Sequence, residues 1–206
     1  MKKKDVLKIL KNNLNFSEIS IHKIDKFQKF LIDYNKSYNL ISESTEKEVW
    51  TRHILDSAQI VNLINFKDHY SLSDLGSGAG FPGLVIAAFN TNSRFHVKLY
   101  EKSTIKCNFL RESCEKFNIN AEVFDGNYID HKIESEYLVC RAFKKLDKVI
   151  DISREIARFK HKLIILKGRK AKEEIESLSQ KLEYKYELIK SITDQKSRIL
   201  VIDVKK

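Results

Sequence analysis

A glycine-rich segment of ten residues constrains the fold of this chain more than any other feature. Residues 74–83 read Asp-Leu-Gly-Ser-Gly-Ala-Gly-Phe-Pro-Gly and hold four of the chain's six glycines. The strand-like run Tyr70–Leu75 enters this segment, and the apolar run Leu84–Phe89 follows it. A strand, a glycine loop and a helix in this order let backbone N–H groups approach a nucleotide-like ligand closely. Pro82 suits the first turn of that helix, where its missing N–H is not needed.

The glycine segment fits two nucleoside-binding patterns. Gly76, Gly78 and Gly80 behind Asp74 form the acidic G-x-G-x-G pattern that is usual in S-adenosylmethionine (AdoMet) methyltransferases. Gly78, Gly80 and Gly83 also form the G-x-G-x-x-G pattern of dinucleotide-binding proteins. A tight turn between a strand and a helix, with no ligand, is the third interpretation.

A carboxylate follows at the position where a nucleoside ribose is commonly held. The next predicted strand, 96–101, ends at Glu101. Both candidate cofactors carry a ribose diol, so this residue supports a nucleoside ligand and leaves the choice between the two open.

Charge is unevenly distributed along the chain. The formal net charge of +10 divides into +3 for residues 1–70, −2 for residues 71–140 and +9 for residues 141–206. A near-neutral cofactor centre beside a basic C-terminal third predicts a polyanionic partner such as nucleic acid. The alternative is that many lysines of this Lys-rich chain solvate helix faces.

Length and apolar content predict a globular protein. A chain of 206 residues suits one domain with an extension. No apolar run reaches the about 20 residues that span a bilayer, and no secretory segment follows Met1–Asp5, so we expect a cytoplasmic protein. Cys107, Cys114 and Cys140 lack metal-ligand spacing; we expect small buried side chains in a reducing compartment and no metal site.

Apolar periodicity divides the chain into a helical part and an α/β part. Apolar residues at three- and four-residue spacing predict helices within residues 1–69. The predicted buried strands are Leu72–Leu75, Val97–Glu101, Ala121–Phe124, Tyr137–Cys140 and Leu163–Lys167. The predicted helices lie near 84–90, 104–118, 145–159 and 171–183, and Tyr186–Ile192 pairs with Arg198–Val204 in a terminal hairpin.

This pattern predicts an α/β fold with a doubly wound, Rossmann-like sheet that ends in an antiparallel pair. A helical N-terminal cap, residues 1–69, precedes a domain of residues 70–206. In such sheets the ligand binds beyond the carboxyl ends of the strands.

The sequence disfavours two kinds of base methylation. Amino-group methylation commonly uses an Asn-Pro-Pro-aromatic loop after the fourth strand, but residues 139–143 read Val-Cys-Arg-Ala-Phe. Methylation of cytosine C5 needs a thiolate nucleophile, and the fifth strand ends in Leu166–Gly168 without a second cysteine beside Cys140. A ring nitrogen such as guanine N7 offers an in-plane lone pair, so it requires alignment rather than a general base.

Basic residues at predicted strand ends are candidates for substrate contact. Arg141 and Lys167 suit contact with phosphate, guanine or cofactor; the alternative for each is a surface charge or an ion pair. Arg52 and His53 lie in the helical cap, where a single histidine is more commonly structural than catalytic.

Five segments, taken together, resemble one protein family. They are Tyr34–Leu40, Arg52–Ser57, Asp74–Gly83, Arg141–Phe143 and Leu166–Gly168. In this order and spacing they resemble the bacterial 16S ribosomal RNA (guanine-N7)-methyltransferases, also called glucose-inhibited division protein B. The resemblance covers nearly the whole chain, and the five segments together are specific where the glycine segment alone is not.

The resemblance implies AdoMet as methyl donor and a guanine of 16S rRNA, in the small ribosomal subunit, as acceptor. It implies that Arg52, His53 and Lys167 face the RNA. With the glycine pattern, the expected cofactor-binding residues are Asp74, Gly76, Gly78, Gly80, Phe81, Glu101, Tyr128, Ile129 and Arg141. No catalytic base is assigned.

One segment departs from the family pattern. Family members often have a small or apolar residue followed by Glu where this chain has Tyr128-Ile129, and Arg where it has Asn127. We therefore expect backbone groups or Asp125 to contact the adenine of the cofactor.

Two other functions stay open at this point. One is a non-catalytic RNA-binding or ribosome-assembly protein that retains the cofactor fold. The other, suggested by the second glycine pattern, is a nicotinamide-dependent enzyme. For an RNA-docking protein of this kind we expect a monomer.

Overall fold

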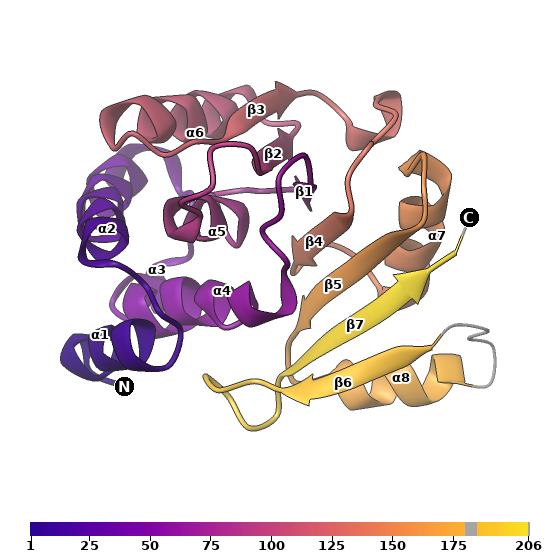
Figure 1. Ribbon diagram of the computed structural model, residues 1–206. Coiled ribbons are helices and arrows are strands. Elements are labelled where there is room, and N and C mark those ends of the chain that lie inside the picture. The colour runs from indigo at the N-terminus through magenta and orange to yellow at the C-terminus, as the bar shows by residue number, and fades with distance from the viewer. Residues whose placement is uncertain (180–184, 206) are drawn as a thin grey trace.

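A seven-stranded sheet forms the centre of the protein (Figure 1). The computed structural model describes residues 1–179 and 185–205. The strands are β1 (Ser71–Leu75), β2 (His96–Glu101), β3 (Glu122–Asp125), β4 (Tyr137–Arg141), β5 (His161–Lys167), β6 (Tyr186–Lys190) and β7 (Arg198–Val204). Their order in the sheet is β3-β2-β1-β4-β5-β7-β6. Strands β1 to β5 run parallel, and β7 runs antiparallel to both β5 and β6.

Helices cover both faces of the sheet. They are α1 (Lys3–Asn12), α2 (Glu18–Tyr38), α3 (Glu43–Glu46), α4 (Asp56–Ala58), α5 (Gly83–Phe89), α6 (Thr104–Lys116), α7 (Leu146–Ile156) and α8 (Ala171–Ser179). A π-helical turn, Trp50–Leu55, precedes α4, and 3₁₀ turns occupy Val61–Leu63 and Tyr128–Asp130. Helix α2 packs against α5 and α6, whereas α7 packs against α8 (Figure 1).

The predicted elements are confirmed, with ends that differ by a few residues. Helix α8 begins at 171 as predicted, but residues 180–183 of the predicted helix lie outside the described residues. Pro82 stands just before α5 rather than in its first turn, and its carbonyl accepts the first helical hydrogen bonds, from Val85 and Ile86. Two of the three cysteines, Cys107 and Cys140, are buried as expected, while Cys114 is half-buried.

Local sequence explains how the cap turns back on itself. The Ser17 hydroxyl accepts a hydrogen bond from the Ser20 N–H and caps the start of α2. Asn39, in a left-handed conformation, ends the helix. The buried Asn35 accepts a 2.9 Å hydrogen bond from the Ile41 N–H and donates a 3.0 Å bond to Glu46. This part of the Tyr34–Leu40 segment therefore fixes the turn that follows α2.

Two apolar clusters fill the interior. The first joins cap residues such as Phe27, Leu31 and Ile54 to sheet residues such as Leu72 and Val97, so the cap covers one face of the sheet. The second packs α7 against the opposite face of β4 and β5. Among the described residues, no helix is long and apolar enough to cross a membrane.

Strand order defines where a ligand would bind. The chain moves outward from β1 to β2 and β3, then returns to place β4 on the other side of β1. At such a reversal the loops after neighbouring strands diverge and leave a crevice at the carboxyl ends. In this sheet the reversal lies between β1 and β4, and the glycine segment begins at the carboxyl end of β1.

Candidate cofactor and substrate site

The glycine loop, residues 76–83, folds closely over the end of β1. Gly76, Gly78 and Gly80 all have positive φ, and the N–H groups of Gly76 and Ser77 donate to the Tyr100 carbonyl at 2.9 and 3.0 Å. A Cβ added at Gly78 would meet only the Gly76 carbonyl oxygen, at 3.8 Å, among the described residues. The backbone at Gly78 therefore borders open space that a ligand can occupy.

Asp74 is fully buried beneath this loop. One carboxylate oxygen, Oδ2, accepts a 2.9 Å hydrogen bond from the Gly83 N–H at the start of α5. The other, Oδ1, has no hydrogen-bond partner within the described parts of the chain. Burial raises the pKa of Asp74 to about 7. A buried acceptor of this kind fits a ligand that carries a hydrogen-bond donor or a positive charge.

Glu101 stands at the edge of the loop, at the end of β2. Its Oε2 accepts from the Gly78 N–H and its Oε1 from the Ser103 N–H, both at 2.9 Å. These two bonds fix the carboxylate, and each oxygen keeps a lone pair for a further donor. The geometry suits two adjacent hydroxyl groups, such as those of a ribose.

Tyr128 and Ile129 take different positions after β3. The Tyr128 ring packs edge-on against Phe143, with 5.0 Å between ring centroids, and a Cβ added at Gly76 would lie 2.8 Å from the same Phe143 ring. Ile129 is 47% exposed. Asp125, the alternative adenine contact, forms an ion pair with Arg111 at 2.9 Å.

Arg141 joins the end of β4 to the helical cap. Only 17% of its side-chain surface is exposed. Its guanidinium donates to the Arg52 carbonyl at 2.8 Å and to His53 Nδ1 at 2.7 Å, and it pairs with Asp56 at 3.5 Å. It also lies over the Phe81 ring, 5.2 Å from the centroid. Of the interpretations offered by the sequence, an ion pair is present and a free surface charge is not.

His53 is held between the cap and the glycine loop. Because Nδ1 accepts from Arg141, Nε2 carries the proton and donates to Thr45 Oγ1 at 2.9 Å. The ring stacks on Phe81 at 5.0 Å. Burial, with the nearby charges of Arg141 and Arg52, lowers the pKa of His53 to about 3. His53 is therefore neutral, and both ring nitrogens are already bonded within the protein.

A pocket of about 430 Å³ adjoins this arrangement, beyond the ends of β4 and β5. We call it the basic pocket. Its lining includes Arg52, His53, Arg141 and Lys167, so it brings together all three predicted RNA-facing residues and one predicted cofactor residue. Lys167 is engaged, however: its ammonium pairs with Glu174 at 2.7 Å and donates to the Lys144 carbonyl.

Sequence reasoning missed several residues of the basic pocket. They are Asp56, Gln59, Arg169, Lys170, Ser191, Thr193, Asp194 and Arg198. Arg169 pairs with Asp194 at 3.2 Å, whereas Arg52 and Lys170 form no ion pair with any residue that the structure describes. The run Lys-Gly-Arg-Lys at 167–170 and the basic C-terminal third were the available signals.

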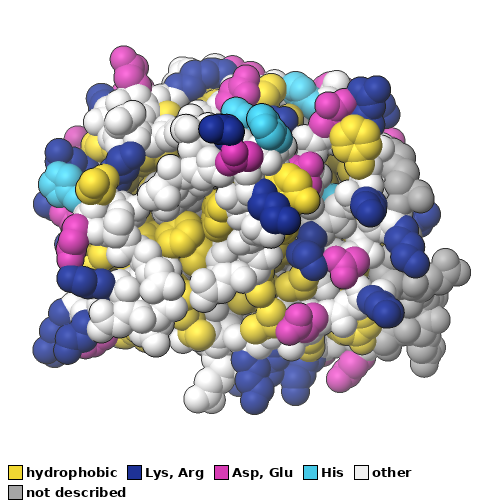
Figure 2. All heavy atoms as spheres, in the orientation of Figure 1, with side chains coloured by type: hydrophobic (Ala, Val, Ile, Leu, Met, Phe, Trp, Pro, Cys, Tyr) yellow, Lys and Arg dark blue, Asp and Glu magenta, His cyan; other side chains and the backbone are white. Residues whose placement is uncertain are grey.

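Lys and Arg side chains also mark the surface around this region. Figure 2 shows them interspersed with Asp and Glu over the part of the visible face where β5, β7 and α8 lie. Apolar side chains are visible nearer the centre of the same face. This half of the sheet belongs to the basic C-terminal third of the chain.

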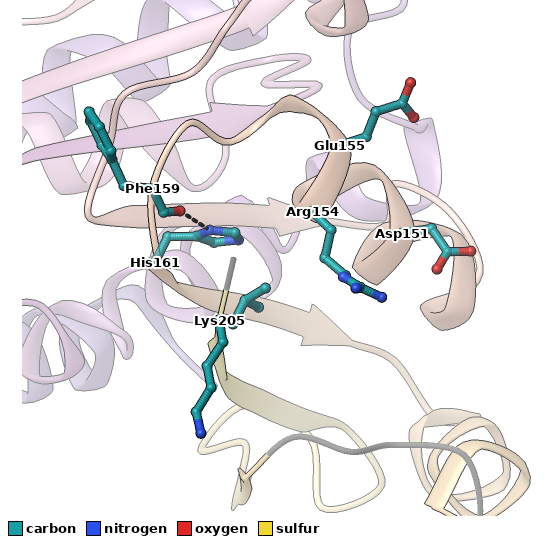
Figure 3. Close-up of a pocket in the computed structure, with 7 residues that line it drawn as sticks. Asp151, Arg154, Glu155, Phe159, His161 and Lys205 are labelled. Carbon is teal, nitrogen blue, oxygen red and sulfur yellow. Dashed lines mark hydrogen bonds between the residues drawn. The ribbon is translucent and has the colours of Figure 1, made fainter.

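A second pocket, of about 340 Å³, lies at the opposite end of β5 (Figure 3). Asp151, Arg154 and Glu155 of α7 line it, together with Phe159 from the segment before β5 and His161, the first residue of β5. His161 Nδ1 donates to the Phe159 carbonyl at 3.1 Å. Because this pocket is at the amino end of a parallel strand, it is remote from the glycine loop.

Several solved methyltransferases share this fold. An Aquifex aeolicus SAM-dependent methyltransferase matches with a TM-score of 0.58 and 14% identity, covering 82% of this chain and 97% of that one. A putative S-adenosyl-L-methionine-dependent methyltransferase from Methanococcus maripaludis also matches with a TM-score of 0.58, at 13% identity over 87% and 92% of the two chains. The fold is thus that of the Rossmann-like class I methyltransferases. In its sheet the glycine loop follows the carboxyl end of β1, and Glu101 is the last residue of β2.

Sequence comparison identifies the family within this class. The family model described as rRNA small subunit methyltransferase G matches residues 20–201. Ribosomal RNA small subunit methyltransferase G of Rickettsia bellii is 35% identical over 182 residues, covering 88% of this chain and 92% of the relative. The protein of the same name from Rickettsia prowazekii is 35% identical over 187 residues, covering 91% and 95%. The chain belongs to the rRNA small subunit methyltransferase G family.

Proposed function

We propose that this protein transfers the methyl group of AdoMet to N7 of a guanine in 16S rRNA. One observation carries the proposal: the glycine loop and the basic pocket share a wall. Phe81 of the loop stacks on His53 and Arg141, and both of these line the pocket. A nucleoside cofactor on one side and an RNA base on the other would therefore be neighbours.

The residues of the loop fit AdoMet, which supplies an electrophilic methyl group on a sulfonium. Glu101, whose carboxylate is held by the Gly78 and Ser103 N–H groups, would accept hydrogen bonds from the ribose diol. The unpartnered oxygen of Asp74 offers a buried hydrogen-bonding group beneath the loop; with a pKa of about 7, the carboxyl is partly ionised at neutral pH. Gly78 leaves the space that the cofactor occupies.

The acceptor chemistry suits a site without a base. Guanine N7 attacks through an in-plane lone pair and has no proton to lose, so catalysis consists of aligning nitrogen, methyl and sulfur. His53 cannot serve as a base, because both ring nitrogens are bonded and its pKa is lowered to about 3. Its role is to hold Arg141 and Phe81 in place between the cofactor and the base.

The basic pocket provides the RNA-binding side of the site. Arg52 and Lys170 are exposed and suit contact with phosphates, whereas Arg141 and Lys167 are engaged in internal pairs that shape the pocket. Phosphate contacts fix the position of the RNA without reading its sequence. We propose a monomer acting on 16S rRNA in the cytoplasm.

Deleting the gene tests this function. The 16S rRNA of the deletion strain should lack one N7-methylguanosine, and the wild-type gene should restore it. A Gly78→Leu variant should fail to restore it, because a branched side chain would fill the cofactor space at a positive-φ position. An unchanged modification profile after deletion would overturn the proposal, and restoration by Gly78→Leu would overturn the cofactor site.

A further inference from the structure

The loop between β6 and β7, residues 191–197, is bonded to the helical cap although it is more than 130 positions away in sequence. Gln59 Oε1 accepts a 2.9 Å hydrogen bond from the Ile192 N–H, and Gln59 Nε2 donates to Ser191 Oγ at 3.2 Å. Thr193 Oγ1 donates to Asp56 Oδ1 at 2.8 Å. We call this set, Asp56, Gln59 and residues 191–193, the polar clamp.

The two sides of the polar clamp are also braced internally. On the cap side, Gln59 Nε2 donates to the carbonyl and to Oδ1 of Asp56, both at 2.9 Å. On the loop side, the hydroxyls of Ser191 and Thr193 are 2.9 Å apart. Asp56 and Ser191 are largely shielded from solvent, with 19% of the Asp56 side chain exposed. Hydrogen bonds in such a setting are stronger than on an open surface.

The clamped residues form one wall of the basic pocket. Asp56, Gln59, Ser191 and Thr193 all line it. Asp194, the next residue of the loop, pairs with Arg169 and so connects this wall to the segment that follows β5. The distance between the cap side, with Arg52, and the far side, with Arg169, is thus set by bonds that cross from the cap to the hairpin loop.

We propose that the polar clamp positions the 191–197 loop as a preformed wall for the RNA substrate. This inference rests on the proposed function, because the occupant of the pocket is the RNA. A hairpin loop held only by its own strands would have to be ordered when the RNA binds, and that ordering would weaken binding. The polar clamp holds the 191–197 loop in one conformation before the RNA binds. Asp56, Gln59 and Thr193 are therefore positioning residues.

Thr193 offers a matched pair of variants. Thr193→Val removes the hydroxyl that donates to Asp56 while keeping the side-chain shape, and Thr193→Ser keeps the hydroxyl. We expect Thr193→Val to raise the KM for 16S rRNA by about threefold to tenfold or more. That range corresponds to the loss of one hydrogen bond, and the variant removes both the bond to Asp56 and the one with Ser191 Oγ. Thr193→Ser should behave like the wild type. Calorimetry should show the same affinity for S-adenosylhomocysteine in all three proteins, since Thr193 bonds to Oδ1 of Asp56, whereas Arg141 pairs with Oδ2.

Gln59→Ala provides a second test from the other side of the clamp and should raise the same KM. Wild-type KM values in both Thr193→Val and Gln59→Ala would overturn the inference. Loss of S-adenosylhomocysteine affinity in step with the change in KM would overturn it too, because the effect would then be general rather than confined to the RNA wall.

Amide hydrogen exchange separates this inference from the proposed function. The amides of residues 191–194 should exchange faster in Thr193→Val than in the wild type or in Thr193→Ser, whether or not RNA is present. Unchanged exchange would overturn the clamp itself. A wild-type protein that transfers no methyl group to 16S rRNA would instead overturn the proposed function.

Discussion

Arg141 makes contacts with three parts of the protein, which its position at the end of a strand did not indicate. It is nearly enclosed, and it bonds to the cap through the Arg52 carbonyl, His53 and Asp56 while lying over Phe81 of the glycine loop. One guanidinium therefore links the cofactor side, the cap and the basic pocket. Lysine could not replace it, because only the planar guanidinium both stacks and donates in several directions.

Glu101 provides the most direct residue-level test of nucleoside binding. Glu101→Gln should weaken binding of S-adenosylhomocysteine by about tenfold or more, because a hydrogen bond to a charged acceptor is worth about 1.5–3 kcal/mol. Calorimetric titration measures the change, and Glu122→Gln, on an exposed strand residue, is the matched control. Titration with NAD belongs in the same series, since tight binding of NAD alone would contradict an AdoMet site.

The lowered pKa of His53 should make the free energy of unfolding depend on pH. Its pKa is lowered to about 3 in the folded protein, against about 6.5 in an unfolded chain. Below pH 6.5 the unfolded chain therefore binds a proton that the folded protein does not, so His53 lowers the free energy of unfolding as pH falls from 6.5 towards 3. The slope from this one group is at most about 1.4 kcal/mol per pH unit.

The variant His53→Asn separates the effect of His53 on the free energy of unfolding from that of Asp74. The raised pKa of Asp74 increases the free energy of unfolding as pH falls from about 7 to about 4. His53→Asn cannot titrate but keeps an acceptor for Arg141. On acidification from pH 7 to pH 5, the wild type should lose more thermal stability than His53→Asn. Equal losses in the two proteins would show that folding leaves the pKa of His53 near its value in the unfolded chain.

The close packing of helix α5 against the sheet depends on Gly83. A Cβ at this position would lie 2.3 Å from Leu99 Cδ2 and 2.7 Å from Asp74 Oδ2, so any side chain must push α5 away from β1 and β2. Gly83→Ala should lower the free energy of unfolding by about 1–3 kcal/mol through overpacking. Gly168→Ala, where a Cβ meets no described atom within 4 Å, is the control. Equal melting temperatures for the two variants would contradict this packing.

The sequence predicted elements better than it predicted side-chain partners. Buried parallel strands and amphipathic helices leave apolar runs and periods that can be read locally, and the glycine loop carries its own pattern. The polar clamp leaves no such signal, because Asp56 and Thr193 are ordinary polar residues in distant segments. His53 was expected to face RNA, and it lines the basic pocket, but nothing in the sequence indicated that Thr45 and Arg141 would bond both of its ring nitrogens. Only the folded chain shows these pairings.

At the scale of the whole molecule, the cap and the sheet share one apolar cluster. Phe27, Leu31 and Ile54 of the cap pack in the same cluster as Leu72 and Val97. The division into residues 1–69 and 70–206 stays a prediction about architecture, and we expect the two parts to unfold together. Calorimetry should show a single cooperative transition, with equal calorimetric and van't Hoff enthalpies. Two separate transitions would show that the cap folds independently of the sheet.

In the function that we propose, the glycine loop and the basic pocket serve one reaction on RNA. The most direct test is transfer of labelled methyl from AdoMet to 16S rRNA and to small subunits from a strain that lacks the gene, followed by nucleoside separation. We expect label in N7-methylguanosine for the wild type and little for Glu101→Gln. Label in a different nucleoside would contradict the assigned acceptor atom, and no label in either substrate would contradict methyl transfer to RNA by this site.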